Sequence, residues 1–279
     1  MITIFSNPRP FTGPFDTIQR NAIGSWLKLG CEIILFDDEE ETTSRVASEL
    51  GVKCLKPVCN EYGTPLLDHE FAAVKAAAVN PVLAHVNADI ILFPEFTLAI
   101  TRIYALLRGG NFFMIGRRWD LDVTEPLDFS GDWQEKVRSS LAAGGKLHGI
   151  SGIDYWVFPK DTPFDPPSFN VGRPGMDSWL VYKARLLKIP VIDATEAITI
   201  VHQNHNYPRK AMPYFEWEVE QNFSMADSLM WGMTLYDSDR VFSAEGDLKT
   251  PPFPRNIFSS LSLFYPWRLI LALKRRLRG

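Results

Sequence analysis

The sequence predicts an α/β protein with a single, mostly parallel sheet flanked by helices. Runs of β-branched and aliphatic residues alternate with helical patterns from the first residues onward, which is typical of stacked βα units. Gly30 and Gly51 follow two of the helical stretches, and Pro94 begins another, in agreement with ordinary helix capping. A chain of 279 residues is long enough to bury the core of one such domain.

Each expected element follows from its residue pattern. Short apolar runs predict strands at residues 2–5, 32–36, 82–86 and 112–116. Helical spacing of apolar residues predicts helices at residues 16–28, 43–50, 65–78 and 94–107. The second half is less regular and predicts helices at 133–142 and 176–187, and strands at 154–158, 189–194 and 197–202.

The Pro-rich stretch at residues 251–254 divides the chain into a domain of residues 1–250 and a C-terminal tail of residues 251–279. The apolar part of the tail is interrupted by Pro266 and Arg268, and it is shorter than the roughly 20 residues that span a bilayer. Aromatic and aliphatic residues followed by four basic residues suit a helical tail lying on an anionic membrane surface. A helix packed on the domain, with a solvated basic end, explains the pattern equally well.

Composition excludes several classes of protein. The formal net charge is −4 and the pI is about 5.8, which argues against nucleic-acid binding because that needs a clustered basic surface. Three cysteines without paired spacing indicate neither a disulfide framework nor a zinc site. The N-terminus has the pattern of a strand and not of a signal peptide. We therefore expect a cytoplasmic protein, peripheral at the inner face of the membrane if the tail binds lipid.

The segment HVNADIILF places Asn87 and Asp89 at the end of an apolar strand. Asn and Asp are ordinary loop formers, and this alone could explain them. An open α/β sheet, however, binds ligands at the carboxyl ends of its strands, where an acid can hold a divalent metal and, through it, a phosphate. The sequence contains no GxGxxG after the first strand and no P-loop, which disfavours the cofactors that those motifs bind.

Other acids and histidines stand at predicted strand and helix ends: Asp37 and Asp38, Asp177 in GRPGMDSW, and His202 and His205 in VHQNHNY. Their order resembles the GT-A family of nucleotide-sugar-dependent glycosyltransferases, and the segments RRWDLDVTEPLDF, GIDYWVF and IVHQNHNY are similar to its glycosyltransferase-like members. In that pattern an acidic DxD-type motif ends a central strand, a Gly-containing loop follows, an acid opens a helix, and a C-terminal His completes the metal shell. NAD, SGID with Gly152 and Asp154, GMD, and a histidine match these in turn.

The resemblance implies a divalent metal, Mn²⁺ or Mg²⁺, held by Asp89 with His202 or His205, and a diphosphate bound beside Asn87. Asn87 replaces the first acid of the usual motif, so metal affinity should depend on Asp89 and a histidine. The resemblance further implies that Asp177 is the base that takes the proton of the acceptor hydroxyl in an inverting transfer. The alternative for Asp177 is a helix N-cap.

The remaining candidates concern the donor. The resemblance implies that Asp38 lies near the base and ribose. Arg9 is expected near the base or a phosphate, and Arg117 near the diphosphate or the acceptor. Solvated acids and surface ion pairs are the alternatives. Trp119, Trp156 and Trp179 could stack on the face of a sugar, and for at least two of them we expect core packing. For His85 we expect a structural role.

The function that follows is a metal-dependent glycosyltransferase that moves a sugar from a nucleotide diphosphate donor to a hydroxyl acceptor, either a glycan or a lipid-linked molecule. The alternative is a non-catalytic module that binds a nucleotide sugar or a glycan on the same fold, for which Asn87 is the best support.

Overall fold

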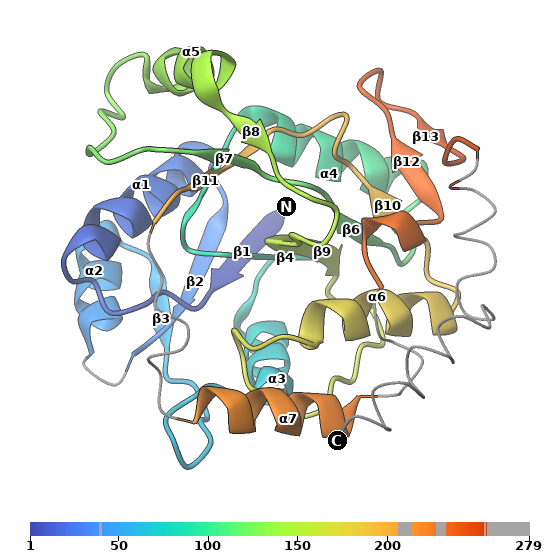
Figure 1. Cartoon of the computed structure of the whole chain (residues 1–279), viewed down its shortest axis with the longest axis horizontal. Coiled ribbons are helices and arrows are strands. Elements are labelled where there is room, and N and C mark those ends of the chain that lie inside the picture. The colour runs from blue at the N-terminus through green and yellow to red at the C-terminus, as the bar shows by residue number, and fades with distance from the viewer. Residues whose placement is uncertain (39–40, 206–213, 227–232, 254, 256–279) are drawn as a thin grey trace.

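A computed structural model describes residues 1–38, 41–205, 214–226, 233–253 and 255 (Figure 1). The basic part of the predicted tail, residues 256–279, lies outside the described residues. No helix in the described part of the chain is long and apolar enough to cross a membrane.

A central sheet of nine strands forms within the described residues, with the strand order β3-β2-β1-β4-β9-β6-β10-β12-β13. Neighbouring strands in it are parallel except that β9 is antiparallel to β4 and β6, and β13 is antiparallel to β12. In chain order the strands are β1 (Ile2–Ser6), β2 (Glu32–Phe36), β3 (Lys53–Leu55), β4 (Val82–Val86), β6 (Phe113–Ile115), β9 (Tyr155–Pro159), β10 (Val191–Asp193), β12 (Arg240–Phe242) and β13 (Leu248–Lys249).

A smaller sheet of four strands continues from the central one. Its order is β5-β11-β7-β8, with β11 antiparallel to β5 and parallel to β7. Its strands are β5 (Ile90–Leu92), β7 (Trp119–Leu121), β8 (Lys146–Leu147) and β11 (Ile200–Gln203). Since β5 follows β4 after a short turn, this sheet brings β11 next to the end of β4.

Helices cover both faces of the central sheet, α1, α2 and α4 on one side and α3 and α6 on the other (Figure 1). The helices are α1 (Pro14–Lys28), α2 (Thr42–Leu50), α3 (Leu67–Ala77), α4 (Pro94–Leu106), α5 (Trp133–Gly144), α6 (Met176–Leu186) and α7 (Phe215–Met225), with a short 3₁₀ helix at Leu235–Asp237. The predicted α/β class, with a mostly parallel sheet flanked by helices, is confirmed.

Side-chain alternation explains the two buried layers. On β2, Ile33 and Leu35 pack on the α1 side, whereas Ile34 and Phe36 pack on the α3 side, because successive strand residues point to opposite faces. Both sets are buried, which is why the strand reads as a continuous apolar run and not as an alternating one. Full burial of each such side chain stabilises the fold by about 1.5–3 kcal/mol.

Candidate functional site

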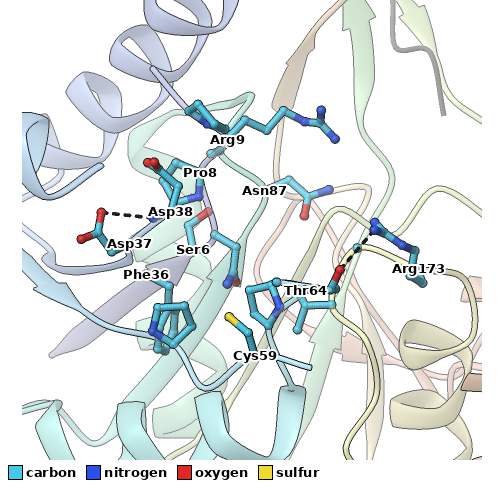
Figure 2. A pocket seen from close by; sticks show the side chains of 18 of the residues that line it. Ser6, Pro8, Arg9, Phe36, Asp37, Asp38, Cys59, Thr64, Asn87 and Arg173 are labelled. Atoms are coloured by element: carbon cyan, nitrogen blue, oxygen red, sulfur yellow. Dashed lines mark hydrogen bonds between the residues drawn. The ribbon is translucent and has the colours of Figure 1, made fainter. Parts of the chain in front are cut away.

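A cavity of about 790 Å³ lies at the carboxyl ends of β1, β2 and β4, a volume within the range of small-ligand sites. Polar side chains line it because parallel neighbours end at the same edge of the sheet. Figure 2 shows Asp37 and Asp38 on one side of this pocket, Thr64 and Arg173 on another, and Asn87 between them. Of the predicted site residues, Arg9, Asp38, Asn87, Asp89 and His205 line the cavity.

Asp89 gathers two histidines at one end of the cavity. The Nε2 atom of His205 lies 3.0 Å from Asp89 Oδ2, and the Nε2 atom of His202 lies 3.4 Å from the same oxygen. The antiparallel register of β11 and β5 pairs His202 with Ile90, which places the imidazole beside Asp89. One ligand atom from each of the three residues lies within 4.8 Å of the others, so these side chains can hold a metal ion.

The charges of this group suit a cation. Burial raises the pKa of Asp89, but hydrogen bonds from His202 and His205 outweigh burial and hold that pKa well below its usual range. The carboxylate is therefore ionised at neutral pH. Its second oxygen, Oδ1, is buried and has no hydrogen-bond partner among the described residues. A buried oxygen without a donor is costly, and coordination of a cation would satisfy it.

A second layer of charged side chains lies behind His202. Asp120 Oδ1 lies 3.4 Å from His202 Nδ1, and Asp120 Oδ2 lies 2.7 Å from His148 Nδ1. Arg118 joins this layer to the next acid, since its Nε atom is 2.9 Å from Asp120 and its Nη1 atom is 2.5 Å from Asp154. A carboxylate on the far nitrogen of a metal-binding histidine fixes the ring orientation. Asp120 lies on that side of His202, at ion-pair distance and without a hydrogen bond to His202 Nδ1.

Asp154 stands between Asn87 and Arg118. Its Oδ1 accepts a hydrogen bond of 2.9 Å from Asn87 Nδ2, and its carbonyl accepts one of 3.0 Å from the Asn87 N–H. Burial raises the pKa of Asp154, the Arg118 guanidinium lowers it and the Asp89 charge raises it again, with a net rise. Asp154 is thus connected, through its hydrogen bonds with Asn87, to the group formed by Asp89, His202 and His205.

Asp177 lies in the first turn of α6, and the helix N-cap is Gly175, so the N-cap alternative does not describe its position. Its Oδ1 accepts a 3.0 Å hydrogen bond from Trp156 Nε1. Burial, together with the charge of Asp154, raises the pKa of Asp177 to about 7. Asp177 is not among the residues that line the cavity, but the preceding Met176 is.

At the other end of the cavity, Asp38 holds the start of α2. Its carboxylate accepts hydrogen bonds from the backbone N–H and the hydroxyl of both Thr42 and Thr43. Burial raises the pKa of Asp38, and these hydrogen bonds lower it below its usual range. Much of the acceptor capacity of this carboxylate is therefore used by the helix. Its role in binding a nucleoside stays a prediction.

Arg117 and Gly152 lie outside the cavity lining. Arg117 Nε donates a 2.6 Å hydrogen bond to the carbonyl of His148. A Cβ atom at Gly152 would lie 2.4 Å from the ring of that histidine, which explains the glycine by packing. Their predicted contacts with the donor stay untested.

Trp156 and Trp179 are buried and Trp119 is partly buried, so two of the three tryptophans pack in the core, as expected. His85 is also buried and stacks on Trp156 with ring centroids 4.0 Å apart, yet it lines the cavity. Tyr62, Arg173, Tyr214 and Glu218 line it as well. Tyr62 lies in the segment of residues 60–68, which the sequence predicts to be a loop that would lie near the donor in a glycosyltransferase. Arg173 comes from the loop before α6, and Tyr214 and Glu218 come from the start of α7, a helix that the sequence did not predict.

Several solved structures resemble this one. A structure of S. aureus TarS 1-349 in complex with UDP-GlcNAc is 12% identical over 82% of this chain and 70% of that one, with a TM-score of 0.49. GalNAc-T7 with UDP, GalNAc and Mn²⁺ is 14% identical over 76% of this chain and 45% of that one, with a TM-score of 0.46. A putative nucleotide-diphospho-sugar transferase from Desulfovibrio desulfuricans G20 is 13% identical over 80% and 96%, with a TM-score of 0.40.

In two further alignments with TarS 1-349, the chain covers 38% of that fragment at a TM-score of 0.34. No protein-family model and no curated protein matches the chain. At these identities and scores, the likenesses carry no argument about the reaction of this chain.

Proposed function

We propose that this protein is a metal-dependent glycosyltransferase that moves a sugar from a nucleoside diphosphate donor to a hydroxyl acceptor, with inversion. The observation that carries the proposal is the convergence of Asp89, His202 and His205 at the end of a cavity formed by the carboxyl ends of parallel strands. One carboxylate and two imidazoles suit manganese better than magnesium, which prefers oxygen ligands.

A divalent cation bound by these three residues would neutralise the charge that develops on the departing diphosphate. The ionised carboxylate of Asp89 supplies the negative charge for binding it. The carboxylate of Asp120 lies 3.4 Å from His202 Nδ1, on the opposite side of that ring from Asp89. Asp89 Oδ1, which is buried without a hydrogen-bond partner among the described residues, fits a coordinating role.

Asp177 is the proposed base. A base must be ionised in part of the population at working pH and must regain a proton readily, so a pKa near 7 suits the task. Trp156 fixes one carboxylate oxygen through a hydrogen bond and orients the other. In this role Asp177 takes the proton of the acceptor hydroxyl as that oxygen attacks the anomeric carbon of the donor.

The first test is calorimetric titration with UDP, GDP, dTDP and CDP, with and without Mn²⁺. UDP comes first because UDP or a UDP sugar is bound in the TarS and GalNAc-T7 structures. We expect one nucleotide to bind in a metal-dependent manner and Asp89→Ala to abolish that binding. Asp165→Ala, at an exposed acid outside the cavity, is the matched control. Binding that is equal with and without metal contradicts the proposal.

A second candidate is a non-catalytic module that binds a nucleotide sugar or a glycan. Asn87 favours it, because an amide replaces the first acid of the motif. Such a module would bind nucleotide without transferring or hydrolysing the sugar, and Asp177→Asn would leave binding and turnover as they are. Measuring release of UDP from a UDP sugar separates the two candidates.

We further propose a domain of residues 1–250 and a tail of residues 251–279 that holds a cytoplasmic protein at the inner face of the membrane. Support comes from the basic and aromatic composition of the tail. Deleting the residues after Pro254 should release the protein from vesicles that contain phosphatidylserine. Equal partitioning of the full and shortened chains would refute the tail's role. A lipid-linked acceptor would fit this location.

A further inference from the structure

One wall of the cavity combines a buried ion pair with aromatic rings. Its residues are Tyr62, Thr64, Arg173, Tyr214 and Glu218, all of which line the cavity. We name these five the Arg173 wall. They come from the loop between β3 and α3, the loop before α6, and the start of α7. Nothing in the reaction described above uses them.

Arg173 and Glu218 form an ion pair of 2.6 Å between Nε and Oε2, with side chains only 7% and 1% exposed. The other oxygen of Glu218 accepts a 3.0 Å hydrogen bond from Asn60. Arg173 Nη2 donates to Thr64 Oγ1 at 3.4 Å (Figure 2). A guanidinium has five N–H groups, and these contacts use two of them. The guanidinium also lies over the ring of Phe215, with its Cζ atom 5.2 Å from the ring centroid, and Arg173 lines the cavity.

The net charge of the Arg173–Glu218 pair indicates which kind of ligand it can bind. Glu218 neutralises Arg173, so the wall as a unit has no net charge. A phosphate bound to the guanidinium would lie near the Glu218 carboxylate, and that repulsion disfavours an anion. Uncharged hydroxyl groups meet no such penalty, and their oxygens can accept hydrogen bonds from guanidinium N–H groups.

Aromatic side chains stand at the rim of the same wall. Tyr62 and Tyr214 stack with ring centroids 3.7 Å apart, and Trp217 meets Tyr62 edge-on at 5.1 Å. They stay exposed to 38%, 53% and 38% respectively. The C–H face of a sugar ring packs well on such partly exposed rings, because it is apolar while its hydroxyls point sideways.

The backbone of Tyr214 supports a specific role for this ring. Tyr214 has φ 69°, in the left-handed region. This conformation costs a non-glycine residue of the order of 1–3 kcal/mol and is concentrated at functional sites. The chain therefore holds the tyrosine at the rim in a strained conformation.

We propose that the Arg173 wall, with Trp217, is the subsite for a saccharide acceptor, an inference that rests on the proposed glycosyl transfer. The donor sugar is covalently tied to the diphosphate and so must lie close to Asp89. The aromatic rim faces solvent, where a second substrate enters. The acceptor hydroxyl would then reach the donor from this wall, and Glu218 would act as a positioning residue for Arg173.

The test uses cellobiose, chitobiose, maltose and lactose as probes, titrated into the full chain in the presence of UDP and Mn²⁺. Tryptophan fluorescence and calorimetry report binding. We expect at least one disaccharide to bind, and Tyr214→Ala and Arg173→Lys each to weaken it at least tenfold. Tyr236→Ala is the matched control, since Tyr236 is 46% exposed and lies outside the cavity lining. Circular dichroism verifies folding of each variant.

Three results would overturn the inference. If the wild type binds a nucleoside diphosphate with metal but none of the disaccharides, the wall is not an acceptor subsite, while the proposed function stands. If Tyr214→Ala and Tyr236→Ala behave alike, the aromatic rim is not involved. If Tyr214→Ala reduces the preference for a UDP sugar over UDP, the wall holds the donor sugar. Absence of any nucleotide binding instead refutes the proposed function itself.

Discussion

Replacing Asp177 by Asn should stabilise the protein at pH 8 while removing its activity. A catalytic base in a poorly solvated position lowers the free energy of unfolding whenever it is ionised. Asn has nearly the same shape and can still accept the hydrogen bond from Trp156 Nε1, but it has no charge to desolvate. The substitution therefore isolates the cost of the carboxylate.

The magnitude follows from the pKa of Asp177, which burial and the Asp154 charge raise from 3.8 to about 7. One pKa unit corresponds to about 1.4 kcal/mol, so ionisation in the folded state costs up to about 4 kcal/mol. The side chain is only partly buried, and solvent screening reduces the expected gain of Asp177→Asn to about 2 kcal/mol.

The pH dependence has a definite sign. Between pH 4 and pH 7, the folded protein keeps a proton on Asp177 that the unfolded chain has released. The free energy of unfolding therefore falls as the pH rises through this window and stays lower above it. The variant lacks this contribution. Its advantage should be close to zero below pH 4, grow up to pH 7 and remain constant above.

Urea denaturation of the wild type and the variant at pH 4, 6 and 8 measures this difference. Asp165→Asn, at an exposed acid, is the control and should show no such trend. If Asp177 instead stabilised the start of α6 through the helix dipole, the variant would lose up to about 1 kcal/mol at pH 8. A loss of stability at pH 8 would refute the reasoning, and so would undiminished transfer by the variant, since a general base contributes roughly 10²–10⁴-fold.

Two further predictions concern buried contacts. Arg173→Met should destabilise the protein by about 3–5 kcal/mol in urea denaturation, because it leaves the Glu218 carboxylate buried without its partner. The double variant Arg173→Met, Glu218→Leu should recover most of that loss. Purely additive effects of the two substitutions would contradict the ion-pair explanation. Gly116→Ala should lower the melting temperature more than Gly144→Ala, since a Cβ at Gly116 would lie 2.2 Å from the hydroxyl of Tyr155 whereas one at Gly144 meets no atom within 4 Å; equal shifts would show that crowding does not set the cost.

The central strands were predictable because each is buried on both faces. The ranges 32–36 and 82–86 agree with β2 and β4, and α4 begins at the predicted Pro94. The short strands β5, β7 and β8 were missed. Each has only two or three residues, too few for a period-two pattern to be distinguished from a loop.

The site was predictable in part because two of its features are visible in the local sequence. Asp89 stands in a recognisable position at a strand end, and the polar segment around His202 and His205 is unusual for a strand. Asp120 was missed because its contact with His202 depends on the pairing of β7 with β11, 82 positions apart in the chain. Local sequence does not encode such a register.

A second long-range pairing, of β9 with β4, explains the amide at position 87. Strand β9 runs antiparallel to β4 and pairs Tyr155 with Val86, so that Asp154 comes to lie against the Asn87 side chain. Asp154 is itself buried, and the Asp89 charge already raises its pKa. An acid at position 87 would add a third carboxylate to this group, against the single guanidinium of Arg118 that contacts Asp154. The amide instead donates a hydrogen bond to Asp154. Asp154, which directly precedes β9, thus brings a carboxyl group into contact with Asn87, although the motif itself has an amide at that position.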